Sequence, residues 1–208
     1  MVSFKRLHSN IWGGLSGDLC TVAKMNMVTI LLSVVANYDW ELQQYDVKNA
    51  LLYGDLEEKI YMEIPPDFGG ELRGKRVCKL KKALYELKQS PGVWFGRFSK
   101  AMTIMGYNQS QGDHTLFINH SKLGGVTTLL VYVDDIIVIR NDLEEREALR
   151  CQLANEFEIK DLGKLKYFLG IEVAYSKRAI FISQHKYVLD LLKETGKLTC
   201  KPVEMPIE

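Results

Sequence analysis

The chain has 208 residues, 47% of them hydrophobic and 25% charged, values typical of a globular protein with one core or two small ones. The longest apolar stretches, residues 28–36 and 126–133, are shorter than the roughly 18 residues that suggest a membrane-spanning helix, and no apolar run follows Lys5 and Arg6 to make a signal peptide. We therefore expect an intracellular protein, in a cytoplasmic particle or the nucleus, that is neither secreted nor bound to a membrane.

The first elements in chain order are an apolar run and two short strands. Residues 28–36 form an apolar run of ambiguous type, for which a helix is one interpretation. Residues 42–47 are typical of a short strand. Residues 57–64 alternate in polarity and end at two prolines, which predicts a further strand.

A helix is predicted to begin at Ser90 and Pro91, with a capping side chain followed by proline at the first helical position. Gly106 supplies its end. Large apolar side chains recur every three to four residues between these points, and we expect them to lie in the core: Trp94, Phe98, Met102 and Met105.

A tight hairpin is predicted next. Two apolar, β-rich runs, residues 126–133 and 136–139, are separated only by Asp134 and Asp135, after a strand candidate at residues 115–118. The mixture of strands and helices favours an α+β fold with a central antiparallel sheet packed on helices.

Two more helices follow the hairpin. The first opens at Asp142 with Glu145 three residues later, a capping-box pattern, and is expected to bury three apolar side chains: Leu149, Leu153 and Phe157. The second spans residues 184–195 and is expected to turn Leu191 and Leu192 inward.

The distribution of charge is more informative than the net charge of +1. Six of the ten residues from 73 to 82 are basic: Arg73, Lys75, Arg76, Lys79, Lys81 and Lys82. Such a stripe fits a phosphate-lined groove, and it equally fits a solvated loop. The four cysteines form no CxxC pair, so we expect reduced thiols and no structural zinc.

Three acidic residues are candidates for metal binding. Asp134 and Asp135 repel each other at the hairpin tip, which either projects into water as an ordinary turn or binds a divalent cation, with Mg²⁺ favoured by all-oxygen ligands. Asp46 stands at the end of another strand. Two-metal phosphoryl transfer needs carboxylates from separate elements that converge on ions about 4 Å apart. A strand acid and a hairpin diacid can supply that geometry.

Five segments in this order resemble the copia-type retrotransposon reverse transcriptases: residues 45–50 (YDVKNA), residues 84–94 (LYELKQSPGVW), residues 111–117 (QGDHTLF), residues 132–135 (YVDD) and residues 157–173 (FEIKDLGKLKYFLGIEV). The resemblance implies a right-hand polymerase palm with incomplete fingers over residues 21–175. Residues 176–208 would be the palm–thumb connection and the start of the connection region.

The same resemblance implies an RNA-directed DNA polymerase domain that transfers nucleotides from dNTP to a primer 3′-hydroxyl with two Mg²⁺ ions, or Mn²⁺ in their place. The implied partners are an RNA or DNA template with its primer, dNTP, and the ribonuclease H and integrase of a retrotransposon polyprotein. Asp46 and Asp134 would bind both metals, with Asp135 as a less critical third carboxylate.

Other residues receive roles from the resemblance. The residues implied to lie near the nucleotide are Leu51, Lys88 and Gln89. Those implied to contact primer or template are Tyr132, Val133, Leu169 and Gly170, joined by the basic-stripe residues Lys79, Lys81 and Lys82. Lys88 and Gln89 also fit an exposed turn before a helix.

The chain departs from the family pattern at several positions. Leu51 replaces a phenylalanine whose ring excludes a ribose 2′-hydroxyl, so weaker discrimination against ribonucleotides is expected. Glu86 replaces a glycine, and Gly92 replaces an arginine, which removes one cation and adds one anion near a polyanionic substrate. Residues 1–20 match nothing in the family, and we hypothesise that a frameshift near Cys20 produced them, which the coding DNA would reveal. Because the chain stops at Glu208, no ribonuclease H activity is expected.

Three functions remain open from the sequence. The chain is an RNA-directed DNA polymerase palm, a catalytically inactive remnant that at most binds nucleic acid, or a metal-dependent nuclease that uses the same three acids. Glu86, Gly92 and Leu51 favour the remnant, whereas the resemblance in the nucleotide and primer segments argues against the nuclease.

Overall fold

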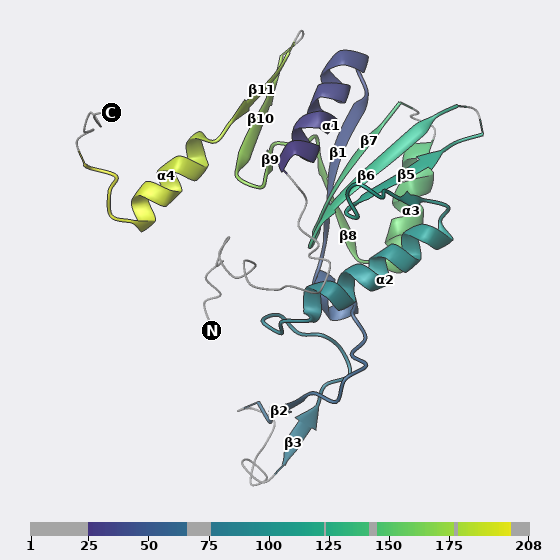
Figure 1. Ribbon diagram of the computed structural model, residues 1–208, viewed down its shortest axis with the longest axis vertical. Helices are drawn as coiled ribbons and strands as arrows, with labels where there is room; N and C mark the ends of the chain where they lie inside the picture. Colours follow the sequence, from purple (N-terminus) through teal and green to yellow (C-terminus); the bar gives the residue numbers. More distant parts are fainter. Residues whose placement is uncertain (1–24, 66–75, 123, 142–144, 177–178, 201–208) are drawn as a thin grey trace.

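The computed structural model of the chain describes residues 25–65, 76–122, 124–141, 145–176 and 179–200. Its centre is a six-stranded antiparallel sheet with the strand order β4-β5-β6-β7-β1-β8 (Figure 1). The strands are β1 (Glu41–Val47), β4 (Asn108–Gln109), β5 (Leu116–His120), β6 (Val126–Tyr132), β7 (Asp135–Arg140) and β8 (Ile159–Gly163). The predicted α+β fold with a central antiparallel sheet is confirmed.

Both faces of the sheet are buried. The side chains of β6 and β7 alternate between two hydrophobic clusters, because neighbouring residues of a strand point to opposite faces. One face packs against α2 (Ser90–Ile104) and α3 (Glu145–Glu156). The other packs against α1 (Met25–Tyr38) and a small sheet formed by β9 (Tyr167–Phe168), β10 (Ile171–Tyr175) and β11 (Ile180–Ser183).

Two parts extend from this body (Figure 1). The short helix η1 (Ala50–Tyr53) leads from β1 into a two-stranded ribbon of β2 (Tyr61–Glu63) and β3 (Val77–Lys79). The last described helix, α4 (His185–Glu194), follows β11 on another side of the molecule.

The helix prediction for α2 is confirmed in its end and its buried face. Trp94, Phe98 and Met102 are buried, Met105 is half-buried, and Gly106 ends the helix with a φ of 88°. The capping prediction is wrong. The Ser90 hydroxyl donates a hydrogen bond to the Leu84 carbonyl at 2.6 Å and does not cap the helix, which begins one residue earlier than expected.

Three other expectations need correction or limits. The strand predicted at residues 57–64 shrinks to Tyr61–Glu63, because β3 pairs with only those three residues. The proposed capping box at Asp142 lies outside the described residues, although Leu149, Leu153 and Phe157 are buried as expected. Residues 1–24, with the proposed frameshifted segment, also lie outside them.

The inward orientation predicted for α4 is wrong. Leu191 is 47% exposed, Leu192 is half-buried, and no residue of this helix is buried. The first turn of the helix contacts the small sheet, where the Lys186 amide donates to the Glu172 carboxylate at 3.0 Å and the Tyr187 ring lies beside Gly170. Most of its apolar side chains remain exposed.

Two expectations from the sequence concern the cysteines and membrane-spanning helices. The described cysteines, Cys78, Cys151 and Cys200, are free thiols. Of the described helices, none is long and apolar enough to cross a bilayer.

Candidate active site

Two of the three candidate acids lie directly opposite each other on neighbouring strands. Asp46, near the end of β1, is the register partner of Asp135, the first residue of β7. Register partners in an antiparallel pair project from the same face of the sheet. This face is the one that carries Leu42 and Ile137 and packs against α1.

The spacing of this pair follows from the adjacent hydrogen bond. The Val47 amide donates to the Asp134 carbonyl at 2.7 Å, so the neighbouring Asp46–Asp135 pair is of the type without mutual backbone hydrogen bonds. Cα atoms in such pairs are about 4.5 Å apart, and their side chains lie closer than those of hydrogen-bonded pairs. The strands therefore bring two carboxylates within a side-chain length of each other.

The turn that holds Asp134 is fixed from a separate element. Val133 has a φ of 51°, an unusual value for a β-branched residue. The indole N–H of Trp94, on α2, donates to the Val133 carbonyl at 2.7 Å. Trp94 is 1% exposed, so this bond also satisfies a buried donor. The buried helix thus stabilises the strained backbone next to the acid pair.

Tyr85 lies in the electrostatic field of two of the acids. Burial raises the pKa of its hydroxyl, and the negative charges of Asp134 and Asp46 raise it further. Tyr85 is still 45% exposed, so its hydroxyl group remains accessible to solvent while it is within reach of the charges of these two acids. Its place in the sequence, inside the LYELKQ segment, gave no sign of this position.

The acid positions fit a divalent cation in ligand type, but their side chains do not converge in the structure. Carboxylate oxygens are the ligands that Mg²⁺ prefers. Over the described part of the chain, however, no group of three His, Cys, Asp or Glu side chains is close enough to hold a metal ion. The backbone brings Asp46, Asp134 and Asp135 together, whereas a three-ligand site requires a change of side-chain orientation.

The segment that resembles the primer grip lies next to the hairpin. The Tyr132 ring packs edge-on against the Phe168 ring, with centroids 6.1 Å apart. Leu169 and Gly170 follow with φ values of 49° and 82° and form the turn between β9 and β10. A Cβ atom on Gly170 would lie 3.3 Å from the Tyr187 ring, so glycine is required there by both its φ and its surroundings.

The residues expected near the nucleotide occupy different environments. Leu51 lies in η1 with 6% exposure and packs in the same cluster as Trp94, so its side chain faces the core. Lys88 is exposed, and the Gln89 amide donates to the Glu58 carboxylate at 3.3 Å. Lys88 and Gln89 immediately precede α2, as the exposed-turn interpretation expects.

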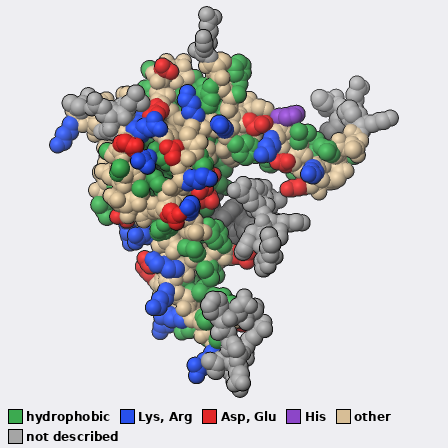
Figure 2. Space-filling model, turned by 180° about the vertical axis from the view of Figure 1, so that it is seen from behind, with side chains coloured by type: hydrophobic (Ala, Val, Ile, Leu, Met, Phe, Trp, Pro, Cys, Tyr) green, Lys and Arg blue, Asp and Glu red, His purple; other side chains and the backbone are tan. Residues whose placement is uncertain are grey.

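Four residues of the basic stripe are described, and they lie on β3 or next to it, in the part that projects away from the central sheet (Figure 1): Arg76, Lys79, Lys81 and Lys82. Arg73 and Lys75 lie outside the described residues. The side chains of Lys79, Lys81 and Lys82 are exposed, and Lys82 pairs with Asp55. Figure 2 shows Lys and Arg side chains along this projecting part of the molecule. The described lysines of the stripe are thus accessible to solvent, and they lie on the projecting part and not on the central sheet that carries the acid pair.

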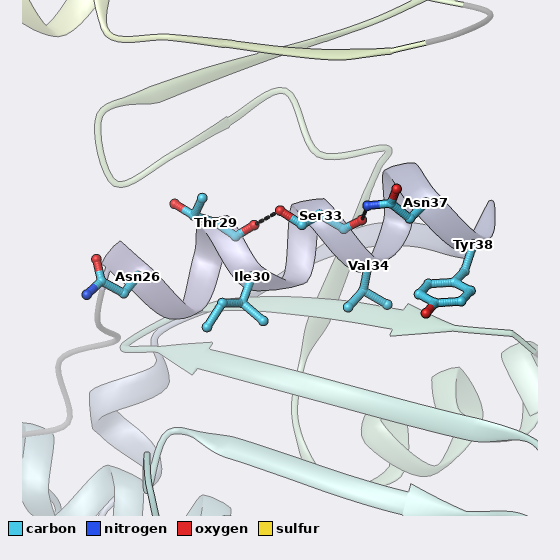
Figure 3. Close-up of a pocket in the computed structure, with 7 residues that line it drawn as sticks. All are labelled: Asn26, Thr29, Ile30, Ser33, Val34, Asn37 and Tyr38. Carbon is cyan, nitrogen blue, oxygen red and sulfur yellow. Dashed lines mark hydrogen bonds between the residues drawn. The ribbon is translucent and has the colours of Figure 1, made fainter.

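Two surface hollows lie outside the acid pair. The larger, of about 700 Å³, lies along α1 and is lined by uncharged residues (Figure 3): Asn26, Thr29, Ile30, Ser33, Val34, Asn37 and Tyr38. The smaller, of about 200 Å³, adjoins the end of β1 and is lined by Lys48, Asn49, Leu52, Tyr53 and Glu158. Neither includes a residue that the sequence assigned to the site.

One further side chain at the acids went unnoticed in the sequence. Gln44, two residues before Asp46, is 7% exposed, and its amide donates to Asp135 Oδ1 at 2.9 Å. The alternation of side chains along β1 places Gln44 and Asp46 on one face of the sheet, and this alternation was the sequence signal that could have identified Gln44. The diagonal contact to Asp135 depends on strand register, which the sequence did not specify.

Comparison with known proteins agrees with this architecture. A sequence model of the family described as reverse transcriptase (RNA-dependent DNA polymerase) matches residues 16–208. The Pol polyprotein of transposon RE1 from Arabidopsis thaliana is 38% identical over 186 residues, and that of transposon TNT 1-94 from Nicotiana tabacum is 37% identical over 190 residues. Each alignment covers 89% of this chain but only 13% and 14% of the respective relatives.

A shorter relative gives a more even comparison. The transposon Ty5-1 protein of Saccharomyces cerevisiae is 29% identical over 163 residues, which are 78% of this chain and 53% of that protein. No solved structure gives a significant match.

Proposed function

Because the chain belongs to the reverse transcriptase family of retrotransposon Pol polyproteins, we propose that it is an RNA-directed DNA polymerase palm with Asp46, Asp134 and Asp135 at its centre. The observation that carries this proposal is the strand register that sets Asp46 opposite Asp135. Enzymes of this family use a divalent metal. The partners would be a template, its primer and dNTP.

The chain's own residues would act through position and charge. Asp46 and Asp134 would hold both ions, with Asp135 as third ligand. Once bound, two Mg²⁺ or Mn²⁺ ions would supply activation of the primer 3′-hydroxyl and stabilisation of the leaving pyrophosphate. Trp94 and Val47 fix the backbone that presents Asp134.

The primer end would lie against the neighbouring turn. Tyr132 and Val133 would flank its terminus, and Leu169 and Gly170 would support it from the β9–β10 turn. The contact of Tyr132 with Phe168 supports this arrangement, because it joins the hairpin to that turn. Lys88 and Gln89 would lie beside the nucleotide, whereas the Leu51 side chain faces the core and does not support the contact with the ribose that the sequence predicts.

Primer extension with Mg²⁺ tests the proposal. The wild-type chain is compared with Asp134→Asn, which keeps the size of the side chain and removes its charge. Extension by the wild type that falls at least a hundredfold in the variant is the expected result. Equal extension by both would remove Asp134 from the mechanism.

A second candidate is a catalytically inactive remnant that binds nucleic acid. Glu86 favours this candidate. Its backbone is in the left-handed region, with a φ of 75°, at a position where the copia-type pattern has glycine. Absence of extension in both chains, together with retained binding of a primer–template, would support this candidate. Neutralising Lys79, Lys81 and Lys82 should then weaken binding and reduce its salt dependence.

A further inference from the structure

Gln44 is a buried amide that contacts a candidate metal ligand. Its Nε2 donates to Asp135 Oδ1 at 2.9 Å and lies 3.5 Å from the Tyr167 carbonyl oxygen at the start of β9. Its side chain is only 7% exposed. The amide is therefore anchored between β7 and the small sheet and is not a mobile surface group.

This hydrogen bond lies where two negative charges face each other. Like charges at register positions of an antiparallel pair destabilise it, and Asp46 and Asp135 form such a pair. A donor on Asp135 offsets part of this repulsion, and bonds from an amide to a carboxylate are stronger than those between neutral groups. A divalent cation between the two carboxylates would offset the same repulsion.

We propose that Gln44 is a positioning residue that holds the Asp135 side chain toward the middle of β1 while the site is free of metal. Cation binding then has to displace the hydrogen bond between Gln44 and Asp135. The inference rests on the proposed metal site. Gln44 precedes Asp46 by two residues, so its amide attracts Asp135 Oδ1 along the strand and away from the hairpin tip. This explains why the carboxylate side chains do not converge although their backbone positions do.

The test measures Mn²⁺ binding directly, by electron paramagnetic resonance of the free ion during titration of the full chain. Gln44→Met keeps the length of the side chain and its burial but removes the donor. We expect its dissociation constant for Mn²⁺ to fall about tenfold below that of the wild type, since one charge-assisted hydrogen bond no longer competes with the ion. The rise in melting temperature on Mn²⁺ addition should be larger in this variant.

The chain offers a matched control on the same strand. Gln43 is also buried, and its amide donates to Asp161 Oδ2 at 2.6 Å on the opposite face of the sheet. Gln43→Met should leave Mn²⁺ affinity unchanged. If Gln44→Met prevents folding, Gln44→Asn replaces it, because the shorter amide cannot span the same distance.

Asp46→Asn separates failure of this inference from failure of the metal site. Loss of Mn²⁺ binding in Asp46→Asn with tighter binding in Gln44→Met supports the proposal. Loss of binding in Asp46→Asn with equal or weaker binding in Gln44→Met overturns the role of Gln44 and leaves the metal site intact. Unchanged binding in Asp46→Asn overturns both.

Discussion

Single residues of this chain hold strained backbone conformations that lower its stability. Non-glycine residues with positive φ are uncommon, and besides Leu169 two more lie in segments of the candidate site: Glu86 at 75° and Val133 at 51°. They differ in support. The Val133 carbonyl accepts a hydrogen bond from buried Trp94, whereas the Glu86 side chain is exposed. The strain at Val133 is thus maintained by a specific contact, and that at Glu86 can be removed by substitution.

Replacement of Glu86 by glycine should stabilise the fold. Relief of the left-handed strain is worth about 1–2 kcal/mol, offset by about 0.5 kcal/mol for the greater freedom of glycine in the unfolded chain. We expect a net gain near 1 kcal/mol in the free energy of unfolding, measured by urea denaturation. Lys88→Gly is the control, because Lys88 has no positive φ in the described backbone and should lose stability. A loss in both variants would contradict the assignment of strain to Glu86.

The hydrogen bond from Trp94 should matter for catalysis as well as for stability. Trp94→Phe keeps an aromatic ring in the core but leaves the Val133 carbonyl without its donor, at a cost of about 1–2 kcal/mol. Primer extension should fall by more than tenfold, because the turn that presents Asp134 loses its anchor. Phe98→Leu changes a buried ring that packs on Trp94 but leaves the hydrogen bond to Val133 in place, so it should reduce stability with little effect on extension. Equal losses of extension in both variants would argue against a positioning role.

At the scale of elements, the position of β1 between β7 and β8 depends on a buried polar cluster as well as on apolar packing. The Arg140 side chain is 1% exposed; its Nε donates to Glu41 at 2.7 Å and its Nη2 donates to Gln43 Oε1 at 2.6 Å. Gln43 in turn donates to Asp161 on β8. These bonds join three neighbouring strands, β7, β1 and β8.

Removal of the guanidinium should therefore loosen the sheet. Arg140→Met leaves the buried Gln43 Oε1 without its donor and Glu41 with only its pair to Arg146, and we expect a loss of about 3 kcal/mol in the free energy of unfolding. Arg146 also pairs with Glu41, but its side chain is 46% exposed, so Arg146→Met should cost no more than about 0.5 kcal/mol. Urea denaturation of both variants checks this contrast. Similar small losses would show that the buried cluster adds little.

The elements also show how far the sequence could predict the structure. Periodicity identified α2, the buried face of α3 and the β6–β7 hairpin, because each is specified by local alternation and by a neighbouring turn residue. It failed for α4, since an amphipathic pattern reveals an apolar face but not whether a partner is present. The resemblance to copia-type reverse transcriptases predicted that Asp46 and Asp134 belong to one site. The contacts of Gln44 and Trp94 depend on register and packing between distant segments, which no local pattern encodes.

At the scale of the whole molecule, apolar surface is distributed unevenly. The central sheet is covered on both faces, whereas β11 and α4 expose large apolar side chains: Phe181, Ile182, Tyr187, Val188, Leu189 and Leu191. Exposed apolar side chains gathered on two consecutive elements favour association of the chain with itself or with other proteins. It contributes little to the stability of the body, because no residue of α4 is buried.

Truncation after Ser183 separates these two properties. We expect the urea unfolding free energy of the shortened chain to remain within about 0.5 kcal/mol of the full chain, because none of the described residues after Ser183 is buried. Self-association, measured by sedimentation velocity, should decrease. Leu32→Ala in α1 provides the contrast. Leu32 is 5% exposed in the cluster that covers the acid-bearing face, so this variant should lose about 3 kcal/mol. A truncated chain that unfolds as readily as Leu32→Ala would mean that α4 stabilises the sheet through contacts other than those of its first turn.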